Sequence, residues 1–461
     1  MKKRTFTLLL ASLLISTFSL HAQQWVKHGV GISSNQGICA IDLSAPSDNV
    51  AWAIFGQFAA GTCGGVVPYY AKTVSGISWS GGVMAIPITQ TPVCISAIDA
   101  NTAWVATCNP GTQETGRVYK TSNGGTSWVL QSTAIFTDAA RFIHFYDANE
   151  GVVIGDSAIY ITSNGGTTWT PNGSLPIPAN TFSTRTQFLL NSYEVLGNMI
   201  WLGDTYGNFY KSNDRGLTWT LLPGCINPSA IKGIAFKDAL NGIAVASVWV
   251  SGGGNGPGGY ADMSVRTTDG GNTWQSQPII FSSPNVAAGS AIYDATYIPG
   301  TANTYIACSE YDSTWSAYSV ISTDGGATWS LIDSTEQHTV CVFTSPTNGY
   351  SGGYVKDFSR GIFKWSGSLP TGITEANWNN DVSVYPNPTS DEINIEFPES
   401  EKKSEVLISL TDINGRAILT QHENLNLSKS TQLNLREFEK GIYILTISSS
   451  ESRMSKLIIH Q

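Results

Sequence analysis

Two aspartates end similar short apolar segments, and paired carboxylates are the groups that carry out glycoside hydrolysis. Asp156 ends the segment Val153-Ile-Gly-Asp, and Asp204 ends Trp201-Leu-Gly-Asp. Hydrolysis of a glycoside needs two opposed carboxylates, or a tyrosine nucleophile supported by charged neighbours. Because both aspartates follow glycine at the same place in a repeated pattern, we interpret them first as turn residues. Catalysis is the alternative for this pair.

A second group of amide and acidic residues recurs within an octapeptide that is found five times along the chain. Its Asn or Asp can close a turn by bonding its own backbone, and the following glycine supplies a positive φ. The tryptophan that ends the octapeptide buries a large ring. We therefore interpret the Asn or Asp as a turn clamp and not as a catalyst. The clamps and tryptophans are Asn123 and Trp128, Asn164 and Trp169, Asp214 and Trp219, Asp269 and Trp274, and Asp324 and Trp329.

The octapeptides mark the ends of repeated four-stranded units. Their tryptophans, together with Trp79 of a decayed copy, lie 41 to 55 residues apart, a period typical of propeller blades. An upstream turn such as Asp99-Ala-Asn-Thr divides the apolar runs of a unit into two strands. Six units end at these tryptophans. A seventh ends at Trp365 without its last strand, which the segment around Trp25 could supply.

The sequence thus predicts an all-β fold, a seven-bladed β-propeller followed by a small antiparallel β-sandwich. Six or eight blades stay open as alternatives. The octapeptides resemble Asp-boxes, also called BNR repeats, and the resemblance covers roughly residues 24–368. It extends to sialidase-type propellers and still more to the photosystem assembly-factor family of propellers. What it implies is the fold, because one fold hosts many activities.

The resemblance to sialidases and related hydrolases lacks several of their features. Residues 23–116 contain no arginine, and the N-terminal Arg-Ile-Pro motif of sialidases is absent. An arginine triad would have to come from Arg141, Arg185, Arg266 or Arg360. A xyloglucan-hydrolase-like enzyme usually pairs two propellers, whereas this chain is predicted to contain one.

The two ends of the chain predict export. Basic residues precede an apolar run that ends near Ala22, so residues 1–22 have the pattern of a signal peptide, and no membrane anchor is expected after its removal. Residues 23–368 are then the propeller. Residues 369–381 have the composition of a linker, and 382–461 form a separate β-domain.

The C-terminal domain resembles the type A sorting domain of type IX secretion, which is found in the Bacteroidetes. The matching residues are Tyr385-Pro-Asn-Pro388, Leu410 to Arg416, Gly441-Ile-Tyr443 and Lys456 to Ile459. The resemblance implies that residues 382–461 are recognised by the outer-membrane secretion machinery and that the linker is cleaved. The protein would then be secreted or held at the cell surface. An ordinary carbohydrate-binding sandwich is the alternative.

Composition excludes several partners. The net charge of −9 and a charged fraction of only 13% argue against nucleic acid, which needs a basic surface. Seven cysteines are an odd number, so at least one thiol stays unpaired. No Cys-x-x-Cys occurs and the histidines are scattered, so we predict no metal site and no cofactor. Cys94 and Cys108 flank one hairpin, which predicts a disulfide within a blade. Cys39, Cys94 and Cys341 leave other pairings open.

The variable loops of the blades are the predicted ligand face. In each blade the two regular turns share one end, and the loops after the second strand lie at the other, where binding residues usually sit. Three such loops, Phe55–Tyr70, Val248–Met263 and Cys308–Tyr318, place aromatic rings beside carboxylates, as sugar sites do. Packing of the rings onto the blades is the alternative. The candidate residues are Tyr69, Tyr70, Trp249, Tyr260, Asp262, Glu310, Tyr311, Asp312, Trp315 and Tyr318.

Taken together, these patterns favour a secreted or cell-surface β-propeller, monomeric, that binds a glycan or a protein without catalysis. A glycoside hydrolase of sialidase-like or xyloglucan-hydrolase-like type is the alternative. An assembly factor is a third class, although the partner of the photosystem relatives is absent outside photosynthetic cells.

Overall fold

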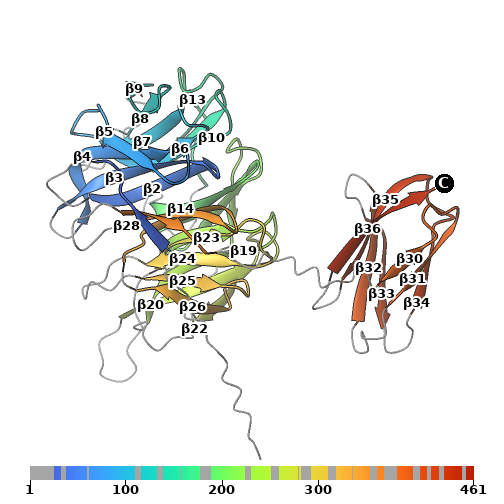
Figure 1. The fold of residues 1–461 in the computed structure, drawn as a ribbon. Helices are drawn as coiled ribbons and strands as arrows, with labels where there is room; N and C mark the ends of the chain where they lie inside the picture. Colours follow the sequence, from blue (N-terminus) through green and yellow to red (C-terminus); the bar gives the residue numbers. More distant parts are fainter. Residues whose placement is uncertain are drawn as a thin grey trace, which may run out of the picture. The chain divides into compact units, whose positions relative to one another are not determined.

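The protein is described here by a computed structural model, which is all β in the described residues (Figure 1). These residues are 25–32, 38–59, 62–109, 116–131, 139–156, 158–176, 188–223, 230–250, 259–278, 280–281, 292–309, 318–334, 336–353, 361–367, 382–397, 405–412, 417–424, 430–448 and 453–461. The predicted signal peptide and linker lie outside them. Within the described ranges, no helix has the length and apolar character needed to cross a membrane.

The chain divides into two compact units, the first within residues 1–297 and 305–367 and the second containing residues 368–461. Strands of the first unit form seven sheets in its described part, most of them built from strands consecutive in the chain. The first three sheets contain β2 (Ile38–Ser47), β3 (Val50–Ala59), β4 (Thr62–Thr73) and β5 (Trp79–Val83); β6 (Thr91–Ala97), β7 (Ala103–Cys108), β8 (Arg117–Thr121) and β9 (Val129–Leu130); and β10 (Ala140–Phe145), β11 (Gly151–Gly155), β12 (Ile159–Thr162) and β13 (Thr170–Pro171).

The next sheets continue this order along the chain. They contain β14 (Phe188–Leu196), β15 (Met199–Asp204), β16 (Phe209–Ser212) and β17 (Thr220–Leu222); β18 (Ala230–Phe236), β19 (Gly242–Val250), β20 (Gly259–Thr267) and β21 (Gln275–Pro278); and β22 (Ile280–Phe281), β23 (Ile292–Tyr297), β24 (Tyr305–Ser309), β25 (Ser319–Ser322) and β26 (Thr328–Asp333). The last sheet joins β1 (Trp25–His28) to β27 (Val340–Ser345), β28 (Asn348–Gly353) and β29 (Gly361–Trp365).

The first strand of the chain completes the last sheet, as the sequence predicts. β1 runs antiparallel to β29, with Trp25 opposite Trp365. The indole of Trp25 is buried and donates its N–H to Ser319 Oγ of the preceding sheet at 3.0 Å. This pairing covers the free edge of β29 and ties the N-terminal segment to the last sheet of the first unit.

Burial along a sheet explains the pattern of apolar residues in each unit. Every residue of β6 and β7 is buried, because the first two strands lie between neighbouring sheets, and their sequences are nearly continuous apolar runs. The last strands are short and largely exposed, as in β13. The core of the first unit therefore lies between successive sheets near their inner strands.

Tryptophans of three second strands bind their sheet to the next one. The indole N–H of Trp52 donates to Asp99 O at 2.9 Å, that of Trp104 to Gly165 O at 2.9 Å, and that of Trp201 to Gly270 O at 3.0 Å. A lysine ammonium lies 4.6–5.1 Å from the ring centre of each tryptophan, supplied by Lys72, Lys120 and Lys211 respectively. Buried indoles need such acceptors, and the cation over the ring adds a further attraction.

The two regular turns of a unit share one end of the sheet, which confirms the sequence prediction. The Gly165 N–H of one octapeptide donates to Asn149 O in the upstream turn of the same sheet at 2.8 Å. Gly270 donates to Leu240 O in the same way, also at 2.8 Å. These bonds fix the octapeptide turns as a rim of the first unit.

The second unit consists of two sheets. One contains β30 (Ser383–Tyr385), β31 (Glu392–Glu396) and β34 (Ser430–Asn434); the other contains β32 (Glu405–Asp412), β33 (Ala417–Asn424), β35 (Gly441–Ser448) and β36 (Arg453–His460). All strand pairs are antiparallel. Buried Ile393 and Ile395 of the first sheet share a core with Ile408, Leu445 and Ile458 of the second. The unit is a small β-sandwich, as predicted.

Two of the predicted loops are shorter than the sequence suggested. β3 continues to Ala59 and β4 begins at Thr62, so most of Phe55–Tyr70 is strand. β19 likewise extends to Val250 and β20 begins at Gly259. Glycine and proline in these segments suggested a loop, but pairing with the neighbouring strand satisfies the backbone groups and prolongs both hairpins.

Candidate functional site

The clamp residue of each octapeptide is held inside its own turn. Asp269 is an example: its Oδ1 accepts bonds from Thr273 N and Thr267 Oγ1, both at 2.8 Å, and its Oδ2 accepts one from Thr273 Oγ1 at 2.6 Å. These bonds from Thr273 lower the pKa of Asp269 to about 2. Asn123 makes the equivalent contact with Ser127 N at 3.0 Å. The clamps thus have turn-closing partners and face no common substrate space.

The octapeptide at residues 212–219 has Arg215 where the other four have glycine, and Leu217 at a position where the others vary among Thr, Asn and Ala. Arg215 has a φ of 61° where the others have glycine, a conformation that an L residue adopts at a cost of about 1 kcal/mol. Leu217, two residues on, is exposed. The equivalent Thr126 and Thr167 hydroxyls donate to carbonyls of their own turns, which leucine cannot do. The glycines at the Arg215 position are Gly124, Gly165, Gly270 and Gly325.

Neighbouring groups hold Arg215 in this conformation. Its N–H donates to Asn198 O and its Nε to Asn198 Oδ1, each at 2.8 Å. Its Nη1 forms an ion pair with Glu150 of the preceding sheet. The guanidinium carbon lies 4.8 Å from the ring centre of Tyr146. A strained residue that several contacts retain is a feature of functional surfaces.

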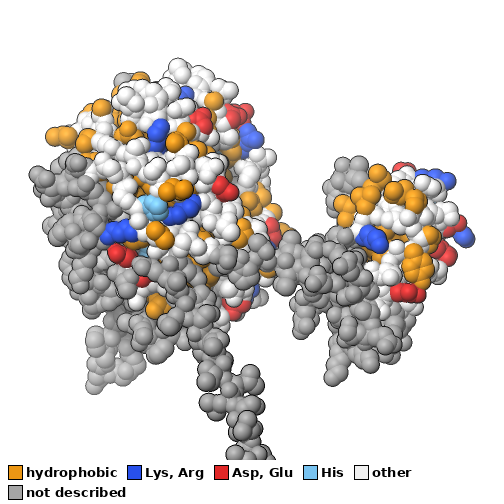
Figure 2. Space-filling model, viewed as in Figure 1, with side chains coloured by type: hydrophobic (Ala, Val, Ile, Leu, Met, Phe, Trp, Pro, Cys, Tyr) orange, Lys and Arg blue, Asp and Glu red, His pale blue; other side chains and the backbone are white. Residues whose placement is uncertain are grey.

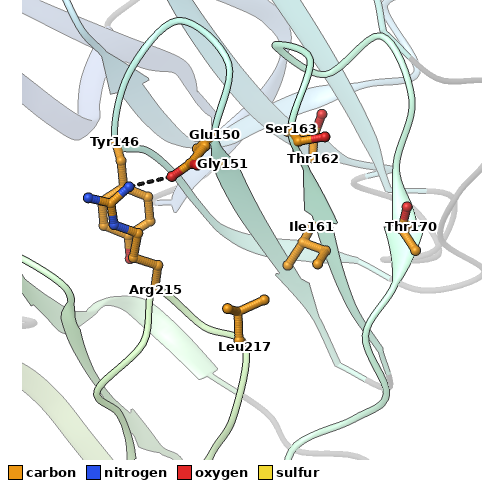
Figure 3. A pocket seen from close by; sticks show the side chains of 9 residues that line it. All are labelled: Tyr146, Glu150, Gly151, Ile161, Thr162, Ser163, Thr170, Arg215 and Leu217. Atoms are coloured by element: carbon orange, nitrogen blue, oxygen red, sulfur yellow. Dashed lines mark hydrogen bonds and ion pairs between the residues drawn. The ribbon is translucent and has the colours of Figure 1, made fainter.

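A groove of about 200 Å³ lies beside Arg215, between the sheets of β10–β13 and β14–β17 (Figure 3). Ile161 and Leu217 face this space, with Thr170 at its far side. The hydroxyl of Tyr146 is buried and has no hydrogen-bond partner among the described residues. Burial raises the pKa of Tyr146 above its usual range. An apolar slot with an unpaired hydroxyl and a charged rim can receive a side chain from another molecule.

A second cavity, of about 110 Å³, lies among inner strands of several sheets and is lined by buried carboxylates. Asp42 Oδ2 accepts the N–H of Ile95, and its carboxylate also accepts the hydroxyl of Tyr193 at 3.2–3.3 Å. Asp294 Oδ2 accepts the N–H of Cys341 at 2.8 Å. Each carboxylate therefore caps a backbone donor of the following sheet, which is a structural role.

The electrostatics of this inner cavity oppose ionisation. Burial raises the pKa of Asp42 to about 6 and that of Glu194 to about 7. Burial, together with the charges of Asp42 and Glu194, raises the pKa of Asp294 to about 8. Within the described residues, no group of three His, Cys, Asp or Glu side chains could hold a metal ion.

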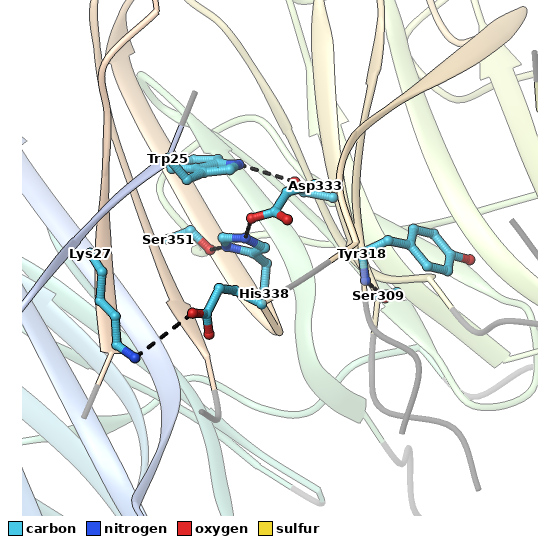
Figure 4. Close-up of polar contacts among 9 residues, drawn as sticks. Trp25, Lys27, Ser309, Tyr318, Asp333, His338 and Ser351 are labelled. Atoms are coloured by element: carbon cyan, nitrogen blue, oxygen red, sulfur yellow. Dashed lines mark hydrogen bonds and ion pairs between the residues drawn. The ribbon is translucent and has the colours of Figure 1, made fainter. Parts of the chain in front are cut away.

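A buried serine, histidine and aspartate meet under the N-terminal strand, a cluster that the sequence analysis did not identify (Figure 4). His338 Nδ1 lies 2.8 Å from Ser351 Oγ, and Nε2 lies 3.4 Å from Asp333 Oδ2. The ring of Trp25 covers His338, with 5.1 Å between ring centres. Ser351 and His338 are fully buried, so a substrate cannot reach them, and the cluster serves to seat Trp25.

The candidate ligand residues fall into three groups. Tyr69 and Tyr318 are buried in the core and cannot contact a ligand, which corrects their assignment. Tyr70 is half-buried, and its ring packs against Gly125 in the next octapeptide turn, at the opposite end from the predicted face. The structure places the backbone of Trp249 on β19 and that of Tyr260 and Asp262 on β20, without describing their side chains. Glu310, Tyr311, Asp312 and Trp315 lie outside the described residues.

The two aspartates considered for catalysis are engaged separately. Arg141 Nε and Nη2 donate to Asp156 at 3.0 and 3.1 Å. Asp204 is fully buried and accepts the N–H groups of Tyr206 and Asn208, at 2.9 and 2.8 Å, as a turn residue does. The interpretation of Asp204 as a turn residue is confirmed, whereas Asp156 has an arginine partner that the repeat pattern did not reveal.

The predicted disulfide between Cys94 and Cys108 is wrong, because both thiols are free. The register pairs Cys94 with Ala106 and Cys108 with Thr91, so the two side chains are not opposite each other. Cys94 Sγ instead contacts Ile143 O and Tyr193 OH, at 3.7 and 3.6 Å. Cys39 is disulfide-bonded.

Comparison with known proteins identifies two recognised elements in the chain. Residues 383–461 match the secretion system C-terminal sorting domain, and residues 320–331 match the BNR/Asp-box repeat. The chain thus contains an Asp-box repeat and a type IX sorting domain, which implies secretion or export to the cell surface. No curated protein matches the sequence.

Solved structures show the fold of the first unit. The structure "YCF48 bound to D1 peptide" is 15% identical with a TM-score of 0.53, covering 76% of this chain and 98% of its own. YCF48 from Cyanidioschyzon merolae is 16% identical with a TM-score of 0.51, covering 74% and 98%. A GH74 xyloglucanase from Xanthomonas campestris is 10% identical with a TM-score of 0.50, covering 94% and 75%. At these identities the likeness extends to the propeller fold alone.

Proposed function

We propose that this protein is an exported, non-catalytic binding module and that the type IX secretion machinery recognises its sorting domain. We further infer that its seven sheets are seven blades of one propeller and that the protein is monomeric. The observation that carries the proposal is the octapeptide at residues 212–219, which departs from the structural repeat toward a surface site. Arg215 and Leu217 line one groove, beside the unpaired Tyr146 hydroxyl.

The chemistry of this groove favours a protein ligand over a sugar. Arg215 covers one face of the Tyr146 ring, and His144 packs edge-on against it, with 4.6 Å between ring centres. A sugar ring therefore has no open aromatic face to stack on. An apolar side chain between Ile161 and Leu217 fits the lining. The YCF48 structure is a propeller of the same fold that has a peptide bound.

The positions of the described carboxylates favour binding over hydrolysis. The octapeptide clamps are bonded within their turns, and Asp156 is paired with Arg141. Asp42 and Asp294 are buried and cap backbone donors. A glycosidase needs two carboxylates that both face the bond to be cleaved. Hydrolysis of any member of a polysaccharide panel by the purified propeller would contradict the proposal and restore the glycoside hydrolase alternative.

The test uses a variant that restores the repeat. Arg215→Gly with Leu217→Thr gives the turn the residues of its neighbours, so we expect a folded protein with a melting temperature close to that of wild type. A peptide library displayed against the exported protein should yield ligands with apolar anchors that bind the variant at least about 10-fold more weakly. Equal binding by both proteins would place the ligand elsewhere.

A glycan array on the same two proteins distinguishes the groove from the predicted loop face. Glycan binding that survives the double substitution and is lost in Trp315→Ala would assign the site to the Cys308–Tyr318 segment. If the folded wild-type protein and the folded variant bind nothing in the peptide library or on the glycan array, the groove has no binding function and this proposal is rejected.

A further inference from the structure

Two buried thiols face each other across neighbouring sheets near the closure of the first unit. Cys308 lies on β24 and Cys341 on β27, and both side chains are buried. Cys308 lies close enough to Cys341 to help raise the pKa of the Cys341 thiol, after the larger effect of burial. The other free cysteines of the described residues are Cys94 and Cys108, and the Cys94 thiol contacts Ile143 O and Tyr193 OH instead.

Asp294 fixes the geometry of this pair. In the ladder between β23 and β24 it lies directly opposite Cys308, and its Oδ2 accepts the N–H of Cys341 at 2.8 Å. The carboxylate also helps to raise the pKa of the Cys341 thiol. The two cysteines are therefore held together by a strand pair on one side and a buried hydrogen bond on the other, which is the close approach that a disulfide requires.

The same chain already contains one oxidised cysteine, because Cys39 is disulfide-bonded. A sorting domain that implies export means that the protein reaches compartments where disulfides persist. We propose that Cys308 and Cys341 form a disulfide in the exported protein, which ties the β22–β26 sheet to the last sheet.

The reaction is thiol–disulfide exchange with a protein disulfide oxidant of the export compartment. One cysteine thiolate attacks the oxidant's disulfide and forms a mixed disulfide; the second thiolate then displaces the oxidant. Two S–H bonds of the chain are replaced by one S–S bond, and the oxidant leaves with its disulfide reduced to two thiols. Burial raises the pKa of Cys341 well above its usual range, so little thiolate exists in the folded protein. Exchange therefore takes place while the last sheet docks.

The proposed disulfide would stabilise the attachment of the last sheet. The last sheet contains β27–β29 and is completed only by the four residues of β1. A covalent link from β27 to β24 would hold the last sheet in place even if the N-terminal strand detached. It would protect the closure of the propeller outside the cell.

The test is peptide mapping of the unreduced mature protein recovered after export. No Lys or Arg stands between Arg266 and Lys356, so trypsin leaves both cysteines in one peptide; cleavage after Glu310 and Glu336 separates them. Free thiols are blocked in denaturant before cleavage. We expect a linked pair of peptides that reduction separates, and its loss in Cys308→Ser and in Cys341→Ser.

Matched variants keep the result interpretable. Cys94→Ser, which removes another buried thiol on an inner strand, should leave the linked peptides unchanged. If the serine variants fail to fold, Cys308→Ala with Cys341→Val keeps the site filled. Its melting temperature should be lower than that of oxidised wild type. It should be close to that of wild type made in a reducing cytoplasm. Blocked thiols at both Cys308 and Cys341 in the exported protein would overturn the proposal.

Discussion

The pKa of a carboxyl group changes in opposite directions in the inner cavity and at the rim formed by the octapeptide turns. On the rim, Asp269 is half-buried and accepts bonds from two neighbouring threonines, which lower its pKa to about 2. In the inner cavity, burial raises the pKa of Asp294 to about 8. Both carboxylates close a backbone contact. The difference is the solvent, because a rim carboxylate keeps its hydration while an inner one loses it.

This comparison shows that hydrogen bonds alone do not set the charge of a carboxylate. Asp294 accepts a good bond from Cys341 N, yet desolvation and the nearby Asp42 and Glu194 outweigh it. Asp269 has comparable bonds, and for this residue they outweigh the desolvation. The two regions therefore contribute to stability at opposite ends of the pH scale.

The largest expected effect is a loss of stability on the alkaline side. The folded pKa of Asp294 lies above its unfolded value, so the folded state binds the extra proton, and this contribution is present in full below about pH 4 and is lost as pH rises toward about 8. Thermal melting should show a lower melting temperature near pH 9 than near pH 5. Asp294→Asn, whose amide oxygen still accepts from Cys341 N, should narrow that difference.

Asp269→Asn is the matched control for this experiment, because it removes a rim carboxylate and should leave the alkaline loss as it is. An alkaline loss of equal size in wild type and Asp294→Asn would show that Asp294 is ionised at little cost in the folded protein, and the contrast between the two regions would fail.

The next effect concerns backbone space on the rim. A Cβ at Gly165 would lie 2.6 Å from Ala148 O, in a turn with a φ of 70°. We expect Gly165→Arg to destabilise the protein by about 2–4 kcal/mol, from the clash and the strained φ together. Arg215→Gly should change stability by at most about 1 kcal/mol, because relief of strain offsets the lost ion pair and ring contact.

Urea unfolding of both variants measures this contrast directly. The physical reason lies in the upstream turns: β14 and β15 are joined by Gly197 and Asn198 alone, whereas β10 and β11 are joined by five residues, Tyr146 to Glu150, that include Ala148. Gly165→Arg as stable as wild type would contradict this explanation. It would mean that the other octapeptide turns also have room for an arginine at the position of Arg215.

The smallest expected effect lies on the acid side of the rim. The folded pKa of Asp269 is below its unfolded value, so its contribution is present above about pH 4 and is lost as pH falls toward about 2. Asp269→Asn should remove this acid loss and leave stability at pH 7 nearly unchanged, because Asn123 and Asn164 close the same turn in other repeats. Melting temperatures between pH 5 and pH 2.5 test this. A large loss at pH 7 would mean that the carboxylate and not the turn shape is needed.

The repeated residues of the sequence predicted the fold because each repeat fixes local structure. Asn or Asp, glycine and tryptophan close the same turn in every copy, and the Trp25 segment completes the last sheet as its place in the pattern required. Export was predictable in the same way, from short motifs within residues 382–461 that the sorting-domain match covers.

The site was less predictable, because its residues are far apart in the sequence or ambiguous by type. Tyr69 and Tyr318 belong to aromatic segments that suggested a surface, but strand pairing turns both rings into the core. The signal that could have indicated the groove was present, because Arg215 and Leu217, two residues apart in one turn, differ from the Gly and Thr of other octapeptides. Tyr146, 69 residues upstream of Arg215, lies outside the octapeptides, so no departure from the repeat indicated its role.

By itself, then, the sequence determined the turns, the strands, the order of the sheets and the route of the protein out of the cell, since these depend on neighbours along the chain. Only the tertiary structure decided which carboxylates lose their water, which thiols meet and which tyrosine hydroxyl is left unpaired. Burial and contact between sheets depend on residues from distant repeats, and no local pattern records them.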